Sequence, residues 1–172
     1  MDILTQKRIT DNGDGKGYFR HCINYVYKEK PEHGEELILT RGFGVSYYNP
    51  NHTYNQMYAV KKYFGKTGDN PIMHFVISFD NNVRDALTAC DYMYKIALFF
   101  ADNYQLIYAV HKENQGGSKY HGHIIVNTVN YKNGKLYHSG YNELADLAVY
   151  IRNITGNYVN PEIKYVDSQN TK

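Results

Sequence analysis

The dipeptide Asn133-Gly134 is the strongest turn signal in the sequence. Asn-Gly favours the tight turn of a β-hairpin, so it predicts that an extended segment at 120–130 returns as a strand at 135–138. Two strands joined by so short a turn run antiparallel. Further strands are predicted at 36–46, 72–79 and 105–111, and helices at about 17–29, 53–64, 82–103 and 142–155. The sequence therefore predicts an α+β domain in which helices back one face of an antiparallel sheet.

Composition is typical of one globular domain. The 172 residues are 42% hydrophobic and 21% charged, which excludes a disordered chain and provides for a buried core. No apolar run approaches the roughly 18 residues of a membrane span. Two cysteines, Cys22 and Cys90, are too few for a disulfide scaffold and suggest a reducing cytoplasm. The stretch after Pro161 has little hydrophobic pattern, so we expect residues 1–172 to be a single domain with a frayed end, the N-terminal part of a longer chain.

Three histidines are predicted to converge on one side of the sheet. His121 and His123 are two residues apart in one predicted strand, so both project from the same face. His111 closes the preceding strand, and a short polar connection brings it level with that pair. Three imidazoles on one side of a sheet form a metal site with open coordination positions, which suits catalysis. The alternative is a set of ordinary polar residues on a solvated sheet face.

Three more residues are predicted to support these ligands from behind. Glu113 follows His111 by two residues and can accept a hydrogen bond from an imidazole, although a solvated loop acid has the same spacing. Asn127 projects from the same face as the histidine pair, and His74 lies on the polar face of its own strand. Nitrogen ligands favour Zn, Mn, Co or Ni over Mg, and the residue types leave the choice open.

A metal with open positions, in a chain with 19 tyrosines, indicates phosphoryl transfer through a tyrosine. Tyr25 lies on the flank of the buried stripe of the helix at 17–29, from where it can emerge over the sheet. A rim residue of the core is the alternative. The segment 61–68 interleaves cations and rings beside a turn, a pattern suited to single-stranded nucleic acid or to a solvated helix end.

In their order along the chain, these motifs resemble the relaxase (mobilisation nuclease) family, in particular its MOBP branch in the HUH endonuclease superfamily. The resemblance spans about Tyr18 to Tyr158 and is carried by Ile23-Asn24-Tyr25-Val26, Arg41–Val45, Ala59–Gly68, His74–Phe79, His111-Lys112-Glu113, His121-Gly122-His123 with Asn127, and Lys135–His138. There are departures. Family members often carry Asp in the position of Glu113 and His in that of Lys119, and the superfamily favours a bulky residue in that of Gly122.

The resemblance implies a relaxase fold, a central five-stranded antiparallel sheet flanked by helices. It also implies a transesterase, a single-strand endonuclease that nicks DNA at an origin of transfer during conjugation or mobilisation. Tyr25 would attack the scissile phosphate, giving a 5′-phosphotyrosine link and a free 3′-hydroxyl that can religate. His111, His121 and His123 would hold a divalent ion, Mg or Mn.

The implied partners are single-stranded DNA, accessory relaxosome proteins and a type IV secretion coupling protein, in the bacterial cytoplasm and without membrane insertion. We predict that Arg41, Lys61, Lys62 and Lys66 contact DNA phosphates, because cations near the motifs can neutralise the backbone.

Three rival interpretations stay open. In a rolling-circle replication initiator or single-strand transposase of the same superfamily the tyrosine follows the HxH motif, so Tyr150 would be the nucleophile. A zinc hydrolase would use the three histidines without Tyr25, and a non-catalytic DNA-binding relative would keep the fold alone. The order of the motifs, with Tyr25 before HxH, favours the relaxase.

Overall fold

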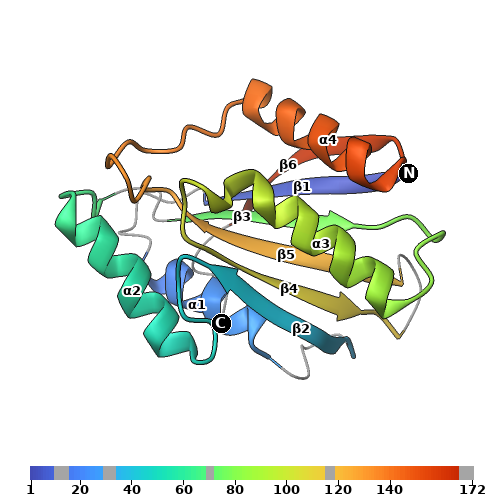
Figure 1. Cartoon of the computed structure of the whole chain (residues 1–172), viewed down its shortest axis with the longest axis horizontal. Coiled ribbons are helices and arrows are strands. Elements are labelled where there is room, and N and C mark those ends of the chain that lie inside the picture. Colours follow the sequence, from blue (N-terminus) through green and yellow to red (C-terminus); the bar gives the residue numbers. More distant parts are fainter. Residues whose placement is uncertain (10–15, 29–33, 69–71, 115–118, 167–172) are drawn as a thin grey trace.

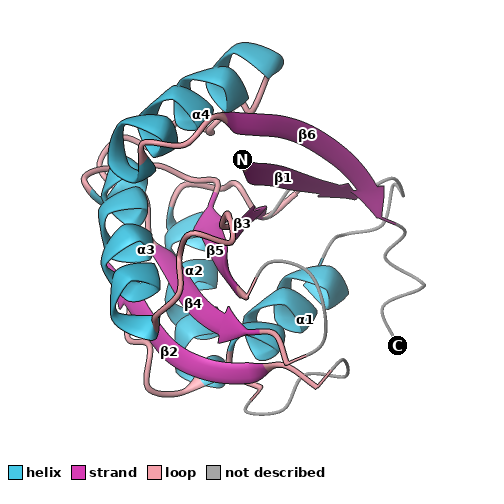
Figure 2. Cartoon of the chain, turned by 90° about the vertical axis from the view of Figure 1, so that its right-hand side faces the viewer, coloured by secondary structure: helices cyan, strands magenta, loops and turns pink. Residues whose placement is uncertain are grey.

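A computed structural model of the chain describes residues 1–9, 16–28, 34–68, 72–114 and 119–166. These residues form one six-stranded sheet with helices on both faces (Figure 1, Figure 2). The strands are β1 (Asp2–Ile9), β2 (Glu36–Phe43), β3 (Ile72–Ser78), β4 (Leu106–Lys112), β5 (Tyr120–Asn127) and β6 (Val159–Val166). The helices are α1 (Lys16–Val26), α2 (Pro50–Tyr63), α3 (Ala86–Ala101) and α4 (Tyr141–Thr155). The α+β class and the four predicted helices are confirmed.

The strand order is β2-β4-β5-β3-β1-β6. Every neighbouring pair is antiparallel except β1 and β6, which are parallel. The sheet therefore has one strand more than the expected five, and one of its pairings is parallel. Two strands, β1 and β6, were not predicted because their sequences are polar. Residues 162–166 are not a frayed end but continue β6, an edge strand, where a proline is tolerated because one side needs no ladder hydrogen bond. The rest of the predicted frayed end lies outside the described residues.

The Asn133-Gly134 turn forms, but the predicted return strand does not. Gly134 takes a φ of +72°, the left-handed conformation that glycine permits. Beyond it the chain makes a single bridge, between Val129 and Leu136, and then leads to α4 (Figure 1). A turn signal fixes the local reversal, whereas a strand also needs a neighbour along its length.

The helices cover both faces of the sheet, so the prediction that they back one face was wrong. On one side α3 and α4 pack on a core that includes Phe75, Ile124 and Val126. On the other, α1 and α2 pack on Ile107 and Ile125. Figure 2 shows the sheet between α3 and α4 on one side and α1 on the other. The central strands β4 and β5 are buried almost throughout, as strands covered on both faces must be. No helix in the described part of the chain is long and apolar enough to cross a bilayer.

Gly122 allows β5 to approach α3 closely, and we expect Gly122→Ala to destabilise the protein by about 1–3 kcal/mol. A Cβ there would stand 2.1 Å from Sδ of Met93, so α3 or the Met93 side chain must shift. Urea denaturation would measure the loss. Gly68→Ala is the matched control, because nothing lies within 4 Å of a Cβ at that site. Equal stability of the two variants would contradict this account of the packing.

Candidate active site

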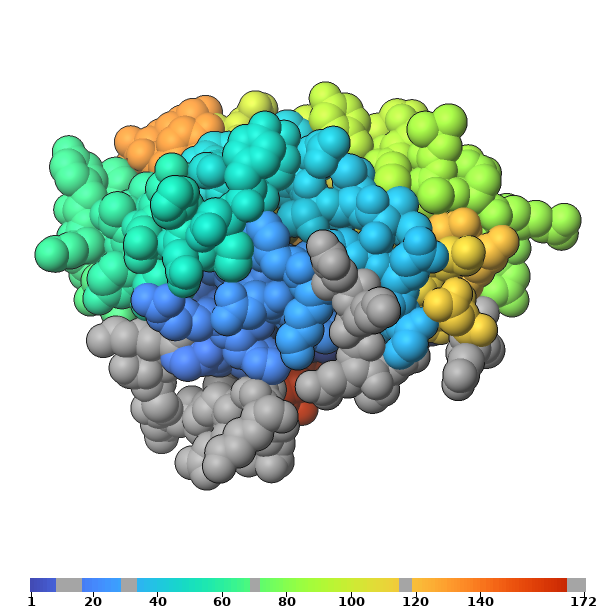
Figure 3. Space-filling model, turned by 90° about the horizontal axis from the view of Figure 1, so that it is seen from below, coloured from blue at the N-terminus to red at the C-terminus, as the bar shows by residue number. Residues whose placement is uncertain are grey.

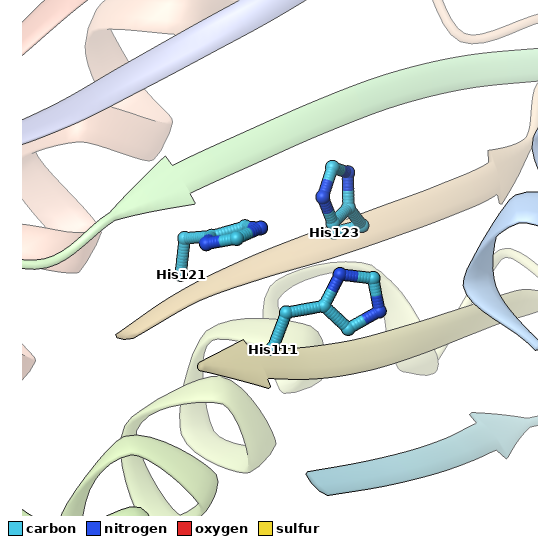
Figure 4. Close-up of side chains that lie close together, drawn as sticks. All are labelled: His111, His121 and His123. Atoms are coloured by element: carbon cyan, nitrogen blue, oxygen red, sulfur yellow. The ribbon is translucent and has the colours of Figure 1, made fainter. Parts of the chain in front are cut away.

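Three histidine side chains converge on the face of the sheet that α1 and α2 cover (Figure 4). His111 lies near the end of β4, directly opposite His121 on β5. The three ring centroids are 5.1–5.3 Å apart, and one ring nitrogen of each histidine lies within 4.8 Å of the others. The convergence that strand periodicity predicted for His111, His121 and His123 is confirmed.

These histidines are not on a solvated sheet face, because at most 4% of each residue is exposed. Burial lowers the pKa of His121 to about 4 and that of His123 well below its ordinary value. Burial also lowers the pKa of His111, against the opposing charge of Glu35. The imidazoles are therefore neutral near pH 7, which leaves ring nitrogens free to act as electron-pair donors.

Several of these nitrogens make no hydrogen bond to any residue that the structure describes. They include Nε2 of His111, Nδ1 of His121 and Nε2 of His123. Buried polar atoms without partners are costly, and a bound cation would satisfy them. The site therefore fits a divalent metal ion held by one nitrogen from each histidine.

His74 lies behind His123, as expected of a supporting residue. Its Nε2 and Nδ1 of His123 are joined by a hydrogen bond of 3.0 Å, and its own Nδ1 lies 3.6 Å from Sγ of Cys22. This hydrogen bond fixes the orientation of the His123 ring and leaves its Nε2 as the nitrogen that can bind a metal ion.

Tyr25 lies over the histidines from α1. Its ring centroid is 5.0 Å from that of His123 and 5.8 Å from that of His111. Ile23 and Val26, both fully buried, hold this helix on the sheet. In Figure 3, α1 (blue) lies between α2 (teal) and the segment at 34–47 (cyan), on the surface of the molecule. The half-buried Tyr25 side chain is thus placed between the three histidines and the outside.

Glu35, which the sequence analysis missed, connects Tyr25 to the histidines. The Tyr25 hydroxyl donates to Oε2 of Glu35 at 3.3 Å. The same oxygen lies 3.3 Å from Nδ1 of His111, and Oε1 lies 3.6 Å from Nε2 of His121. The His111 contact is close but is not a well-formed hydrogen bond. Only the pairing of β2 with β4 brings this carboxylate here, so no local motif signals it.

Of the other predicted supporting residues, Glu113 reaches the site and Asn127 does not. Oε1 of Glu113 lies 3.6 Å from Nδ1 of His121, and burial together with Glu35 raises the pKa of this carboxyl. The Asn127 amide donates to the carbonyl of Met57 and to Gln105. It lies four residues beyond His123, about 13 Å along the strand. Asn127 therefore ties α2 to the sheet.

The four predicted phosphate contacts are scattered. Arg41 is exposed, but its strand partner Tyr108 belongs to the core beneath α3, so Arg41 lies on the face opposite the histidines. Lys61 is 1% exposed, and its Nζ donates to Thr128 at 3.0 Å. Lys62 and Lys66 are exposed near the end of α2. Lys62 and Lys66 thus lie on or next to a helix that covers the histidine face, and their contact with DNA stays a prediction.

The burial of Lys61 indicates that the stability of the folded protein depends on pH. Burial lowers its pKa from 10.5 to about 7 in the folded protein. Between pH 7 and 10.5 the unfolded chain binds a proton that the folded chain does not, so the free energy of unfolding should rise with pH across this window. Each pKa unit corresponds to about 1.4 kcal/mol.

We expect Lys61→Met to remove most of this rise and to stabilise the protein at pH 7 by about 1–3 kcal/mol, because a buried ammonium is replaced by an apolar side chain of similar length. Urea denaturation at pH 7 and at pH 9.5 would measure both effects. Lys62→Met, at the exposed neighbour, is the control and should retain the rise. The same pH dependence in both variants would show that Lys61 is not its source.

Tyr150, the nucleophile of the rolling-circle interpretation, lies on α4 away from the histidines. Its ring packs 5.1 Å from Phe99, and its hydroxyl donates to the carbonyl of Lys95 on α3. Because α3 and α4 cover the opposite face of the sheet, Tyr150 cannot reach a phosphate held at the three histidines without a rearrangement of the fold.

Comparison with known families agrees with the geometry. The chain matches the model "Relaxase: MobA/VirD2-like, nuclease domain" over residues 25–159. No curated protein and no solved structure matches it significantly. The matched segment is most of the chain, starts at Tyr25 and contains the three histidines. The chain therefore belongs to the MobA/VirD2-like relaxase family.

Proposed function

We propose that this domain nicks one DNA strand at an origin of transfer during conjugation or mobilisation, with Tyr25 as the nucleophile. The observation that carries the proposal is the position of the Tyr25 hydroxyl, which is hydrogen-bonded to the Glu35 carboxylate and lies over three buried, neutral histidines. Membership of a nuclease family supports DNA as the substrate. Accessory relaxosome proteins and a type IV secretion coupling protein would complete the transfer machinery.

In the proposed step Glu35 takes the proton of the Tyr25 hydroxyl, and the phenolate oxygen attacks the scissile phosphorus. The new oxygen–phosphorus bond forms as the bond from phosphorus to the 3′ oxygen breaks. The leaving oxygen takes a proton from solvent, so the products are a 5′-phosphotyrosine and a free 3′-hydroxyl. One phosphodiester replaces another, and the 3′-hydroxyl can therefore reverse the reaction and religate the strand.

His111, His121 and His123 would hold the divalent ion that the donor set fits. When bound, the ion supplies positive charge that polarises a phosphate oxygen. Glu113 adds an oxygen donor beside the nitrogens. Imidazole favours Zn, Co or Ni and carboxylate favours Mg or Mn, so the mixed set is compatible with Mn.

The proposed function is tested by incubating the protein with labelled single-stranded oligonucleotides that tile the DNA flanking its coding sequence, with Mn²⁺. A denaturing protein gel would detect a covalent product, and EDTA should remove it. A metal-dependent band supports the relaxase. Metal binding without a covalent band for any oligonucleotide would favour the zinc hydrolase. DNA binding with neither metal binding nor a covalent band would favour the non-catalytic DNA-binding relative.

Glu35→Gln is expected to slow formation of the covalent product by about 10²–10³-fold, because the amide cannot accept the phenol proton. The rate should then rise with pH, as hydroxide replaces the missing base. Single-turnover gels from pH 6 to pH 9 would measure both effects. Glu36→Gln, an exposed neighbour, is the matched control. Equal rates and pH profiles for the two variants would remove Glu35 from the mechanism.

A further inference from the structure

Two cavities near Tyr25 share two of their lining residues. The smaller, of about 240 Å³, is lined by Tyr25 and His74 together with Lys7, Tyr18 and Cys22. The larger, of about 550 Å³, shares Lys7 and Tyr18 with it. The two spaces therefore adjoin at this pair of residues, and together they lead away from Tyr25 along the end of β1.

Lys7 stands on the histidine side of the sheet. It pairs in register with His74 on β3, and His74 is hydrogen-bonded to His123 on β5. Lys7 and His123 are thus two strand spacings apart, roughly 10 Å across the sheet, and are offset by two residues along the strands. Lys7 makes no ion pair with any residue that the structure describes. Its pKa is lowered chiefly by burial, a cost that an anion in the cavity would offset.

Tyr18 supplies a second, independent sign of a missing ligand. The residue is 5% exposed, yet its hydroxyl makes no well-formed hydrogen bond in the described part of the chain, although the Cys22 thiol lies beside it. Burial raises the pKa of this phenol, so the hydroxyl keeps its proton and can donate. A half-buried ammonium and a buried hydroxyl that makes no well-formed hydrogen bond, both lining the same two cavities, suit a phosphate oxygen.

The larger cavity has the size and lining for a nucleotide. Small-molecule sites commonly enclose about 300–1,000 Å³. Its walls include the rings of Tyr137 and Tyr165 and the cation Arg8. Arg8 donates to the carbonyl of Ser139 and so holds the wall at 136–140 in place. Aromatic rings beside cations bind single-stranded DNA by stacking on the bases and neutralising the phosphates.

We propose that Lys7 and Tyr18 bind the phosphodiester next to the scissile phosphate, and that the larger cavity receives the adjoining nucleotide of the single strand. This subsite rests on the proposed function, because it assumes that the scissile phosphate lies at Tyr25 and the histidines. It adds two positioning residues, on β1 and α1, that no sequence motif indicated.

Binding to a labelled oligo(dT) of roughly 20 nucleotides tests the charge at Lys7 without requiring cleavage. Fluorescence anisotropy over a range of salt concentrations should show that Lys7→Met binds about tenfold more weakly than the wild type. The slope of the logarithm of the binding constant against the logarithm of the salt concentration should be smaller in magnitude by about one. Lys7→Arg should keep most of the affinity, and Tyr18→Phe should lose a few-fold. Lys95→Met is the matched control, because it removes a lysine from α3 on the opposite face. If Lys7→Met and Lys95→Met have the same affinity and slope, the subsite is overturned.

Neutral methylphosphonate linkages then locate the contact in an oligonucleotide that the wild type links covalently. With Tyr25→Phe as the background, one linkage adjoining the scissile phosphate should weaken binding, and Lys7→Met should add no further loss at that linkage alone. Additive losses at every linkage would overturn the assignment. If oligo(dT) binding depends on Lys7 but no oligonucleotide is ever linked covalently, the proposed function fails and the anion site stands. If the covalent product forms equally well in Lys7→Met and in the wild type, the proposed function stands and the subsite at Lys7 is overturned.

Discussion

Replacing Tyr25 by Phe is expected to abolish the covalent protein–DNA product, lowering its rate of formation by more than about 10³-fold. The substitution removes one oxygen atom and leaves the ring against His111 and His123. No other group need change, so the fold and metal affinity should remain. Denaturing gels with labelled oligonucleotide and Mn²⁺ would measure the product, and calorimetric titration with Mn²⁺ would measure the affinity.

Tyr150→Phe is the matched control for this loss. It removes the same atom from a tyrosine on the opposite face of the sheet, and we expect it to retain wild-type activity. A covalent band that survives Tyr25→Phe and disappears in Tyr150→Phe would contradict the proposed nucleophile. It would also require the DNA to bind on the face of α3 and α4.

His123→Ala is expected to weaken divalent metal binding by at least about 100-fold and to stop covalent product formation. His123 is the member of the triad whose donor nitrogen is oriented by His74, so its loss removes both a ligand and the fixed geometry. Calorimetric titration with Mn²⁺ measures this directly. Thermal denaturation gives a second reading, because an ion at about 100 times its Kd adds about 2.7 kcal/mol to wild-type stability.

His52→Ala controls for the loss of a histidine, since His52 is exposed on α2 away from the triad. It should bind Mn²⁺ like the wild type. Equal affinity in the two variants would show that the ion binds elsewhere, and product formation that persists in EDTA would show that the reaction needs no metal.

Local periodicity was enough to predict that His121 and His123 share one face of the sheet and that Tyr25 lies on the flank of a buried helical stripe. A strand alternates its side chains, so two histidines two residues apart share a face wherever that strand lies in the sheet. The helical stripe of Phe19, Cys22, Ile23 and Val26 placed Tyr25 on its flank, and these four residues are indeed buried. Both arguments need only the geometry of one element.

Periodicity failed where a strand or a charge depends on distant neighbours. The polar strands β1 and β6 form because they pair with each other and because β1 also pairs with β3, and neither carries an apolar pattern of its own. Lys61 was predicted to contact DNA, yet it is buried against Thr128. Arg41 falls on the far face because its register with β4 is set by the sheet.

The sequence by itself therefore determined the four helices and the strands β2 to β5, the shared face of His121 and His123, and the motif order that resembles relaxases. Only the tertiary structure decided that Glu35 bonds Tyr25 and that Lys7 and Tyr18 stand at the junction of two cavities. The reason is physical. The periodicity of one helix or strand depends only on consecutive residues, whereas pairing between strands far apart in the chain depends on the free energy of the whole packed core.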